Sequence, residues 1–237
     1  TFRLSIQTRN TPQVYDRTDS HLDLRVRPTS HERLPSADGL RDLKDNLHLL
    51  PDSVTRADSH RVVISGGAHL SVALALGAAL PSSRVGTIDV LDQRGATWSS
   101  GPEAGFGDPP QLRVAASGHL APVAGTANRP TVAVYLDLLP GPSDAAFERF
   151  VSEVGPTFAE WRHLTRTTDG LIDSSTAGIL AAEAAAHLRE ISNQNSNAEV
   201  HVLLRAPFPM AILIGRLTNT LRLVAYEWDD SDPTPRE

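Results

Sequence analysis

Residues 61–80 read RVVISGGAHLSVALALGAAL. The run starts with β-branched residues typical of a buried strand, turns at Gly66-Gly67, and continues as an apolar helix that ends at Pro81. A second strand-like stretch follows at residues 85–91. The order strand, helix, strand predicts a βαβ unit, in which a helix joins two parallel strands.

The same pattern returns near the end of the chain. Residues 199–218 read EVHVLLRAPFPMAILIGRLT, and a strand follows at 221–228. Aligning Gly77 with Gly215 sets a shift of 138 residues without a gap. The shift superposes Val62 with Val200, Ile64 with Val202, Leu70 with Phe208, Ala73 with Ala211, Leu76 with Ile214, Val85 with Leu223 and Ile88 with Tyr226. This agreement favours duplication over the alternative that any two amphipathic βαβ units look alike. The shared Ala-x-x-x-Gly spacing predicts that each helix lies close on its sheet.

The remaining segments fit an α/β protein with mainly parallel sheets and a pseudo-twofold internal repeat. We expect one half at residues 1–125 and the other at 126–237. Strands are predicted at 2–6, 21–26 and 131–136, and helices at 40–50, 144–154 and 176–191. Residues 94–130 are rich in Gly, Pro, Ala and Ser and form a connector with one short strand at 112–115. The acidic tail from Asp229 is expected to be frayed.

Composition narrows the function classes. The chain has 237 residues and no cysteine, which excludes disulfides, thiolate zinc sites and cysteine nucleophiles. Its 22 basic and 28 acidic residues give a net charge of -6, which disfavours a long nucleic acid as partner. Neither an apolar run long enough to span a bilayer nor a secretory leader is present, so we expect a cytoplasmic protein. Because the strand at 2–6 starts almost at once after Thr1, we also expect this sequence to be a piece of a longer protein whose upstream effector domain is not included in it.

In parallel sheets, ligands bind beyond the carboxyl ends of the strands. In the first unit, the loop there contains Ser65, Gly66, Gly67 and His69, and its glycines allow backbone amides to approach a phosphate. The alternative is a tight turn with no ligand. On the phosphate hypothesis, Gly66→Val abolishes binding and leaves stability nearly unchanged.

The equivalent loop of the second unit contains Arg205, Pro207 and Phe208. Its prolines lack amide donors, whereas Arg205 can pair with a phosphate and Phe208 offers an aromatic face. The alternatives are a solvated arginine and a core phenylalanine. Further candidate ligand-binding residues are Leu139, Pro140 and Gly141 after the strand at 131–136, and Trp98, which either stacks on a base or anchors packing.

Catalytic motifs are missing from the sequence. It contains neither Gly-x-Ser-x-Gly, a P-loop nor His-Glu-x-x-His, and no Gly-x-Gly-x-x-Gly follows a strand. The nine histidines are not paired at metal-ligand spacing, so no metal site is predicted. The pair Asp169 and Asp173 is explained by the start of a helix. An oxidoreductase-type dinucleotide domain is disfavoured because its glycine fingerprint is absent.

The segment RAPFPMAILIGRL at 205–217, closed by the strand at 221–228, resembles the C-terminal signature of SAVED domains. The resemblance implies two fused CARF-like, Rossmann-type units that sense a cyclic di-, tri- or tetranucleotide in bacterial antiviral defence of the CBASS and CRISPR kinds. It also implies ligand-induced oligomerisation, a fused effector such as a nuclease, a TIR NADase or a protease, and no cofactor or catalytic residue in this domain. The rival is a CARF-type ring nuclease that cleaves its ligand. Because the two loops differ, we expect one asymmetric pocket.

Overall fold

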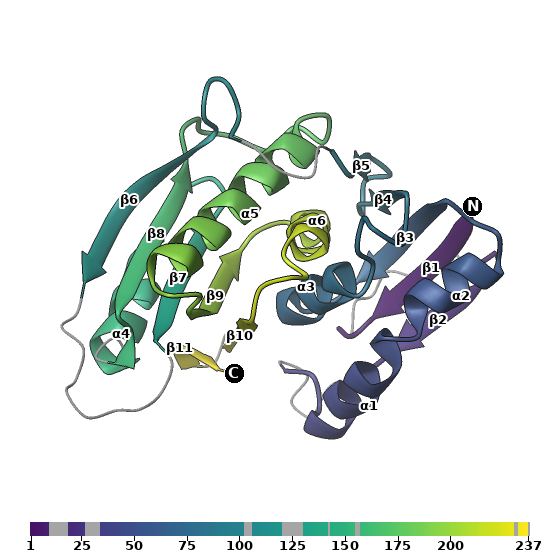
Figure 1. Cartoon of the computed structure of the whole chain (residues 1–237), viewed down its shortest axis with the longest axis horizontal. Coiled ribbons are helices and arrows are strands. Elements are labelled where there is room, and N and C mark those ends of the chain that lie inside the picture. The colour runs from purple at the N-terminus through teal and green to yellow at the C-terminus, as the bar shows by residue number, and fades with distance from the viewer. Residues whose placement is uncertain are drawn as a thin grey trace.

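The computed structural model describes residues 1–9, 19–26, 34–101, 106–119, 130–141, 143–154, 157–229 and 232–236. It contains two sheets, and helices α3 (Leu70–Ala78) and α6 (Phe208–Leu217) lie side by side between them (Figure 1). Each sheet is mainly parallel and carries helices, as the sequence predicts for an α/β protein.

The first sheet has five strands in the order β2-β1-β3-β4-β5. Their bounds are β1 (Phe2–Gln7), β2 (Leu22–Arg25), β3 (Arg61–Gly67), β4 (Thr87–Leu91) and β5 (Thr97–Ser99). The first four strands are parallel, and β5 turns back antiparallel to β4.

The second sheet has six strands in the order β11-β10-β9-β7-β8-β6. Their bounds are β6 (Leu112–His119), β7 (Thr131–Asp137), β8 (Glu160–Arg166), β9 (Glu199–Arg205), β10 (Leu223–Asp229) and β11 (Asp232–Arg236). Its parallel strands β8-β7-β9-β10 repeat the order β2-β1-β3-β4, and β11 turns back on β10 as β5 does on β4. The duplicated topology therefore extends beyond the βαβ unit to whole sheets.

The other helices cover the sheets. Helices α1 (Ala37–Leu47) and α2 (Leu50–Arg56) share the apolar core with the first sheet, and α5 (Ala177–Gln194) does so with the second. Helix α4 (Ala145–Val154) packs on the opposite face of the second sheet, where its Phe150 forms an aromatic cluster with Tyr135 of β7. This split follows the alternation of strand side chains, because Val134 faces α5 and its neighbour Tyr135 faces α4.

Helices α3 and α6 cross at their glycines. A Cβ atom on Gly77 would lie 2.0 Å from the Ile212 carbonyl oxygen, and a Cβ atom on Gly215 would lie 2.0 Å from the Leu74 carbonyl oxygen. Leu74 and Ile212 are themselves related by the shift of 138 residues, so the two contacts exchange under a pseudo-twofold rotation. The repeat predicted from the sequence thus has the expected symmetry. The predicted reason for the glycines was wrong, since they allow α3 and α6 to approach each other rather than allowing each helix to lie close on its sheet.

The ungapped alignment fails after the helices. In the first sheet Val62 is the partner of Ile88, whereas in the second the equivalent Val200 is the partner of Leu223. Ile88 therefore corresponds to Leu223, a shift of 135 residues, and the predicted pairs Val85 with Leu223 and Ile88 with Tyr226 are wrong. The chain between helix and strand is three residues longer in the first unit.

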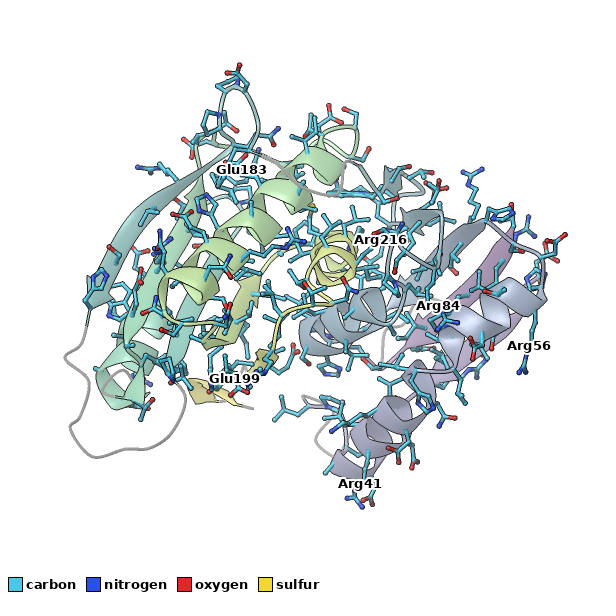
Figure 2. All side chains as sticks on the ribbon, in the orientation of Figure 1. Arg41, Arg56, Arg84, Glu183, Glu199 and Arg216 are labelled. Atoms are coloured by element: carbon cyan, nitrogen blue, oxygen red, sulfur yellow. The ribbon has the colours of Figure 1, made fainter. Side chains whose placement is uncertain are left out.

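Arg216 binds this longer connection. Its guanidinium donates to the carbonyl oxygens of Leu80 at 2.9 Å and Val85 at 2.7 Å, and also to that of Gly86. The side chain lies between α6 and the first unit (Figure 2), and only 4 % of the residue is exposed. A cation of the second unit thus bonds to carbonyl groups on both sides of the three extra residues of the first unit.

Two further local predictions were wrong, and one predicted strand is correct but longer than expected. The helix expected at 40–50 is two helices, because Pro51 occupies the first turn of α2, where proline is tolerated. The connector strand expected at 112–115 is the longer β6 and pairs with β8 in the second sheet, where the fully buried Glu183 of α5 (Figure 2) accepts the Leu112 amide at 2.9 Å. The tail expected to be frayed forms β11, an edge strand that accommodates its prolines.

Candidate ligand pocket between the two units

A cavity of about 750 Å³ opens at the carboxyl ends of the parallel strands of both sheets. Its lining is formed by Arg9, Gly66, Gly67, Ala68, Leu70, Asp92, Gln93, Arg94, Ala96, Trp98, Leu139, Leu171, Ile172, Asp173, Ser174, Leu204, Arg205, Ala206, Pro207, Phe208, Pro209 and Trp228. The loops after β3 and β9 contribute positions that match under the shift of 138 residues, such as Leu70 and Phe208. The cavity therefore lies across the pseudo-twofold axis.

The structure brings most of the predicted site residues together. Gly66, Gly67, Trp98, Leu139, Arg205, Pro207 and Phe208 line the cavity, whereas Ser65, His69, Pro140 and Gly141 do not. His69 lies behind the cavity wall and is 1 % exposed, and its ring Nδ1 lies 2.8 Å from the Thr8 hydroxyl oxygen. Phe208 satisfies both of its predicted alternatives, because it packs on the core and also lines the cavity.

Gly66 is required by the backbone. Its φ angle is +118°, and a Cβ atom there would lie 2.0 Å from the Ile6 carbonyl oxygen of β1. A side chain at this position would both strain the backbone and push β1 away from β3. The expectation that Gly66→Val leaves stability nearly unchanged is therefore wrong.

A carboxylate occupies the start of α3. Glu227 of β10 accepts hydrogen bonds from the Ser71 amide at 3.0 Å, the Ser71 hydroxyl at 2.8 Å and the Leu70 amide at 3.4 Å. An anion at a helix N-terminus is stabilised by the amides and by the helix dipole. In this structure the second unit supplies that anion to the first, at amides next to the loop that the sequence assigned to a phosphate.

Arg205 is held by the end of β7. Its Nη1 donates to the Asp137 Oδ1 at 2.6 Å, and its Nη2 donates to the Pro140 carbonyl oxygen at 3.2 Å. The Asp137 side chain is fully buried. Burial alone would raise the pKa of Asp137, but the nearby His163 imidazole and hydrogen bonds from the Ser143 amide and Arg205 together lower it. Asp137 is therefore ionised at neutral pH and neutralises Arg205, which is not the solvated arginine of the alternative.

Two indole rings border the cavity. Trp98 is 6 % exposed, and its Nε1 donates to the Asp92 Oδ2 at 3.0 Å, which fixes the ring against the β4–β5 turn. Burial raises the pKa of Asp92, but this hydrogen bond and the amides of Ala96 and Arg94 lower it overall. The Nε1 of Trp228 donates to the Leu204 carbonyl oxygen at 2.7 Å. Both indole N–H groups are used within the protein, which leaves the ring surfaces as the groups that a ligand can meet.

Three residues that line the cavity were not predicted from the sequence: Arg9, Arg94 and Trp228. Arg9 follows the end of β1, and Arg94 follows β4. Trp228 is the last residue but one of β10. All three lie at carboxyl ends of parallel strands, so the rule that selected Arg205 would have found them if applied to every strand. Within the described ranges, no group of three or more His, Asp or Glu side chains could hold a metal ion. Of the helices described, none combines the length and apolar character needed to cross a bilayer.

The chain matches the sequence profile of the SAVED family, the SMODS-associated and fused to various effectors sensor domain, over residues 43–235. The protein belongs to the SAVED family. This match confirms the resemblance found in residues 205–217. A search of curated proteins gave no match to this SAVED domain.

Solved structures share the fold of this SAVED domain. The Cap4 SAVED/CARF-domain containing receptor of Acinetobacter baumannii with the cyclic trinucleotide 2'3'3'-cAAA has a TM-score of 0.71 and 15 % identity, covering 99 % of this chain and 50 % of the receptor. The same receptor with 3'3'3'-cAAA gives 0.70 and 16 %, with the same coverage. The Moraxella osloensis Cap4 receptor gives 0.61 and 14 %, covering 98 % of this chain and 48 % of that one. This SAVED domain spans about half the length of the receptors it matches, and their fold confirms the predicted fold class.

Proposed function

We propose that this SAVED domain is a sensor that binds a cyclic oligonucleotide in the cavity between its two units, as part of antiphage defence. The observation that carries the proposal is the position of the cavity, which crosses the pseudo-twofold axis and is lined by the same loops of both units. A cyclic oligonucleotide repeats its own chemistry around a ring, so it suits a site built from repeated loops. The volume of about 750 Å³ lies within the usual range of small-molecule sites.

The lining offers complementary groups for such a ligand. The rings of Trp228 and Phe208 present aromatic surface on which bases can stack, and the largely buried ring of Trp98 lines the cavity beside them. Arg9 and Arg94 provide positive charge for phosphates, which is sufficient for a small ring even though the whole chain is acidic. Salt dependence of binding should therefore be shallow.

The same lining favours binding over cleavage. A ring nuclease needs groups that can transfer protons, and among the described residues around the cavity there is no His, Lys or Tyr. The carboxyl groups present are Asp92 and Asp173, and hydrogen bonds lower the pKa of each, so both are ionised and poor proton donors near neutral pH. For this reason we place the sensor ahead of the ring nuclease.

The test is a binding panel of cyclic di-, tri- and tetranucleotides, measured by calorimetry, with mass spectrometry of the recovered ligand. Micromolar or tighter binding with the ligand intact supports the sensor, whereas linear products would identify a nuclease. If no member of the panel binds, the proposal fails.

We further propose that ligand binding drives self-association and activates an effector domain fused to the sensor. This part is supported by the family description, which names fusion to various effectors, and by the receptors of about twice the length that share the fold. Size-exclusion chromatography with and without the bound ligand tests the assembly step. An unchanged elution volume at saturating ligand would refute it.

A further inference from the structure

Each unit places one arginine at the cavity from the carboxyl ends of its two central strands, which are β1 and β3 in the first unit and β7 and β9 in the second. The strand registers make Gln7 of β1 equivalent to Asp137 of β7 and Gly67 of β3 equivalent to Arg205 of β9. Continuing the first equivalence by two residues pairs Arg9 with Leu139, and both line the cavity. The arginines of the two units therefore lie at non-equivalent positions: Arg205 ends β9 in the second unit, whereas Arg9 follows β1 in the first.

The two arginines differ in how much of their charge a ligand can use. Arg205 is 28 % exposed and donates to the buried Asp137 and to two carbonyl oxygens, at Leu139 and Pro140. Arg9 is 50 % exposed, and its Nη2 lies 3.4 Å from Glu227 Oε1. A guanidinium has five N–H donors, so Arg9 has donors left to form a two-pronged contact with a phosphate.

Glu227 gives Arg9 a fixed anchor. Its side chain is 7 % exposed and is held by Leu70 and Ser71 at the start of α3. The backbone of Arg9 is held as well, because the Gln7 Nε2 donates to its carbonyl oxygen at 3.2 Å. By contrast Arg94, the third arginine at the cavity, is exposed on the β4–β5 turn, and no hydrogen bond of its side chain is found among the described residues.

We infer that Arg9 is the principal phosphate-binding residue of this pocket and that Glu227, reaching from the other unit, is the residue that positions it. The inference rests on the proposed function for the nature of the ligand, and its chemistry requires only a small phosphate anion. Since Glu227 belongs to β10, its ion pair with Arg9 connects a ligand held by Arg9 to the second sheet.

The test compares Arg9→Ala with Arg3→Ala. Arg3 lies at the other end of the same strand, is exposed, pairs with Asp19 and does not line the cavity, so it is a matched control. Binding of 3'3'3'-cAAA and of the inorganic ring trimetaphosphate is measured by calorimetry. We expect Arg9→Ala to weaken binding about tenfold or more, from the usual strength of a charge-assisted hydrogen bond, with Arg9→Lys intermediate and Arg3→Ala unchanged.

The outcomes separate the inference from the proposed function. Equal binding by Arg9→Ala and the wild type overturns the inference and leaves the sensor proposal standing. Binding of trimetaphosphate alone, lost in Arg9→Ala, supports the inference and counts against a nucleotide ligand. Failure of the wild type to bind either probe overturns the inference.

The role of Glu227 is tested by a double-mutant cycle. If Glu227 positions Arg9, the loss caused by Arg9→Ala becomes smaller in a Glu227→Gln background, whereas independent effects would add. Ser71→Ala serves if Glu227→Gln does not fold, because it removes only the hydroxyl that donates to Glu227 at 2.8 Å. Additive effects in both cycles would show that Glu227 is structural only.

Discussion

Adding one methyl group at the crossing of α3 and α6 tests the account of the internal repeat. Gly77→Ala places a Cβ atom 2.0 Å from the Ile212 carbonyl oxygen and 2.9 Å from the Arg216 amide nitrogen. Both contacts are to backbone, so no side-chain rotation can relieve them. The helices have to move apart, and the apolar core that they share has to open with them.

The expected cost follows from two opposing effects. Overpacking a core costs about 1–3 kcal/mol, and a clash with rigid backbone belongs at about 3 kcal/mol, whereas Gly→Ala inside a helix gains about 1 kcal/mol in propensity. Gly77→Ala should therefore destabilise the protein by about 2 kcal/mol, and Gly215→Ala by a similar amount. Because one separation of the helices relieves both clashes, the double variant should cost clearly less than the sum of the single variants.

Urea unfolding followed by circular dichroism measures these differences. Ala75→Gly is the control, since Ala75 is exposed on the same helix and should lose only about 1 kcal/mol of propensity. Glycine would then be harmful at position 75 and necessary at position 77, two residues away. A Gly77→Ala variant as stable as the wild type, or strictly additive glycine variants, would refute the symmetric helix contact.

Three more outcomes follow from the site. Gly66→Val should destabilise the protein by about 3 kcal/mol or more, because it combines a disfavoured φ with a clash, and a urea midpoint equal to that of the wild type would contradict this. Arg205→Ala should lower the free energy of unfolding by about 3 kcal/mol, because it leaves the buried Asp137 without its cation. Thermal unfolding without any ligand measures this loss. An effect on ligand affinity alone would show instead that Arg205 is a phosphate contact. The pKa of Asp137 is lower in the folded than in the unfolded state, so its stabilisation is present above about pH 4 and is lost as the pH falls through the folded-state pKa. Unfolding measured from pH 7 to pH 3 should show a smaller acid-induced loss in Asp137→Asn than in the wild type.

Hydrophobic pattern sufficed for the repeated βαβ unit but not for the chain that follows each helix. The positions from Val62 to Gly77 and from Val200 to Gly215 keep the same spacing because a buried strand and a packed helix tolerate no insertion. The connection after α3 lies outside that constraint. Arg216 stabilises it by bonding to carbonyl groups on both sides of the three extra residues, a role that no local sequence pattern reveals. For that reason the alignment was right through the helix and wrong in the final strand.

The pocket was predicted in position and less well in chemistry. The topology of parallel sheets predicts that the pocket forms at the carboxyl ends of the strands. Gly66, Arg205 and Phe208 meet there for this reason. Which donors remain available to a ligand depends on partners far away in sequence. Glu227 reaches Ser71 across 156 positions, and Asp137 reaches Arg205 across 68. Such pairs are set by tertiary packing, so residue type alone could not show that the α3 amides and Arg205 already have partners.

The helix contact at Gly77 and Gly215 has the form of an interface between two identical subunits. In such an interface each residue of one subunit makes the same contact as its equivalent in the other, as Gly77 does with Ile212 and Gly215 does with Leu74. In a symmetric dimer every substitution appears twice, so a residue that improves one side of a shared cavity also alters the other. Joining the copies into one polypeptide removes that restriction. Arg9 and Leu139 could then diverge at equivalent positions, as could Gly67 and Arg205, while the glycines stayed alike because each still faces the backbone of the other helix. Covalent linkage thus allows one half of the cavity to acquire a charged residue while the equivalent position in the other half stays uncharged.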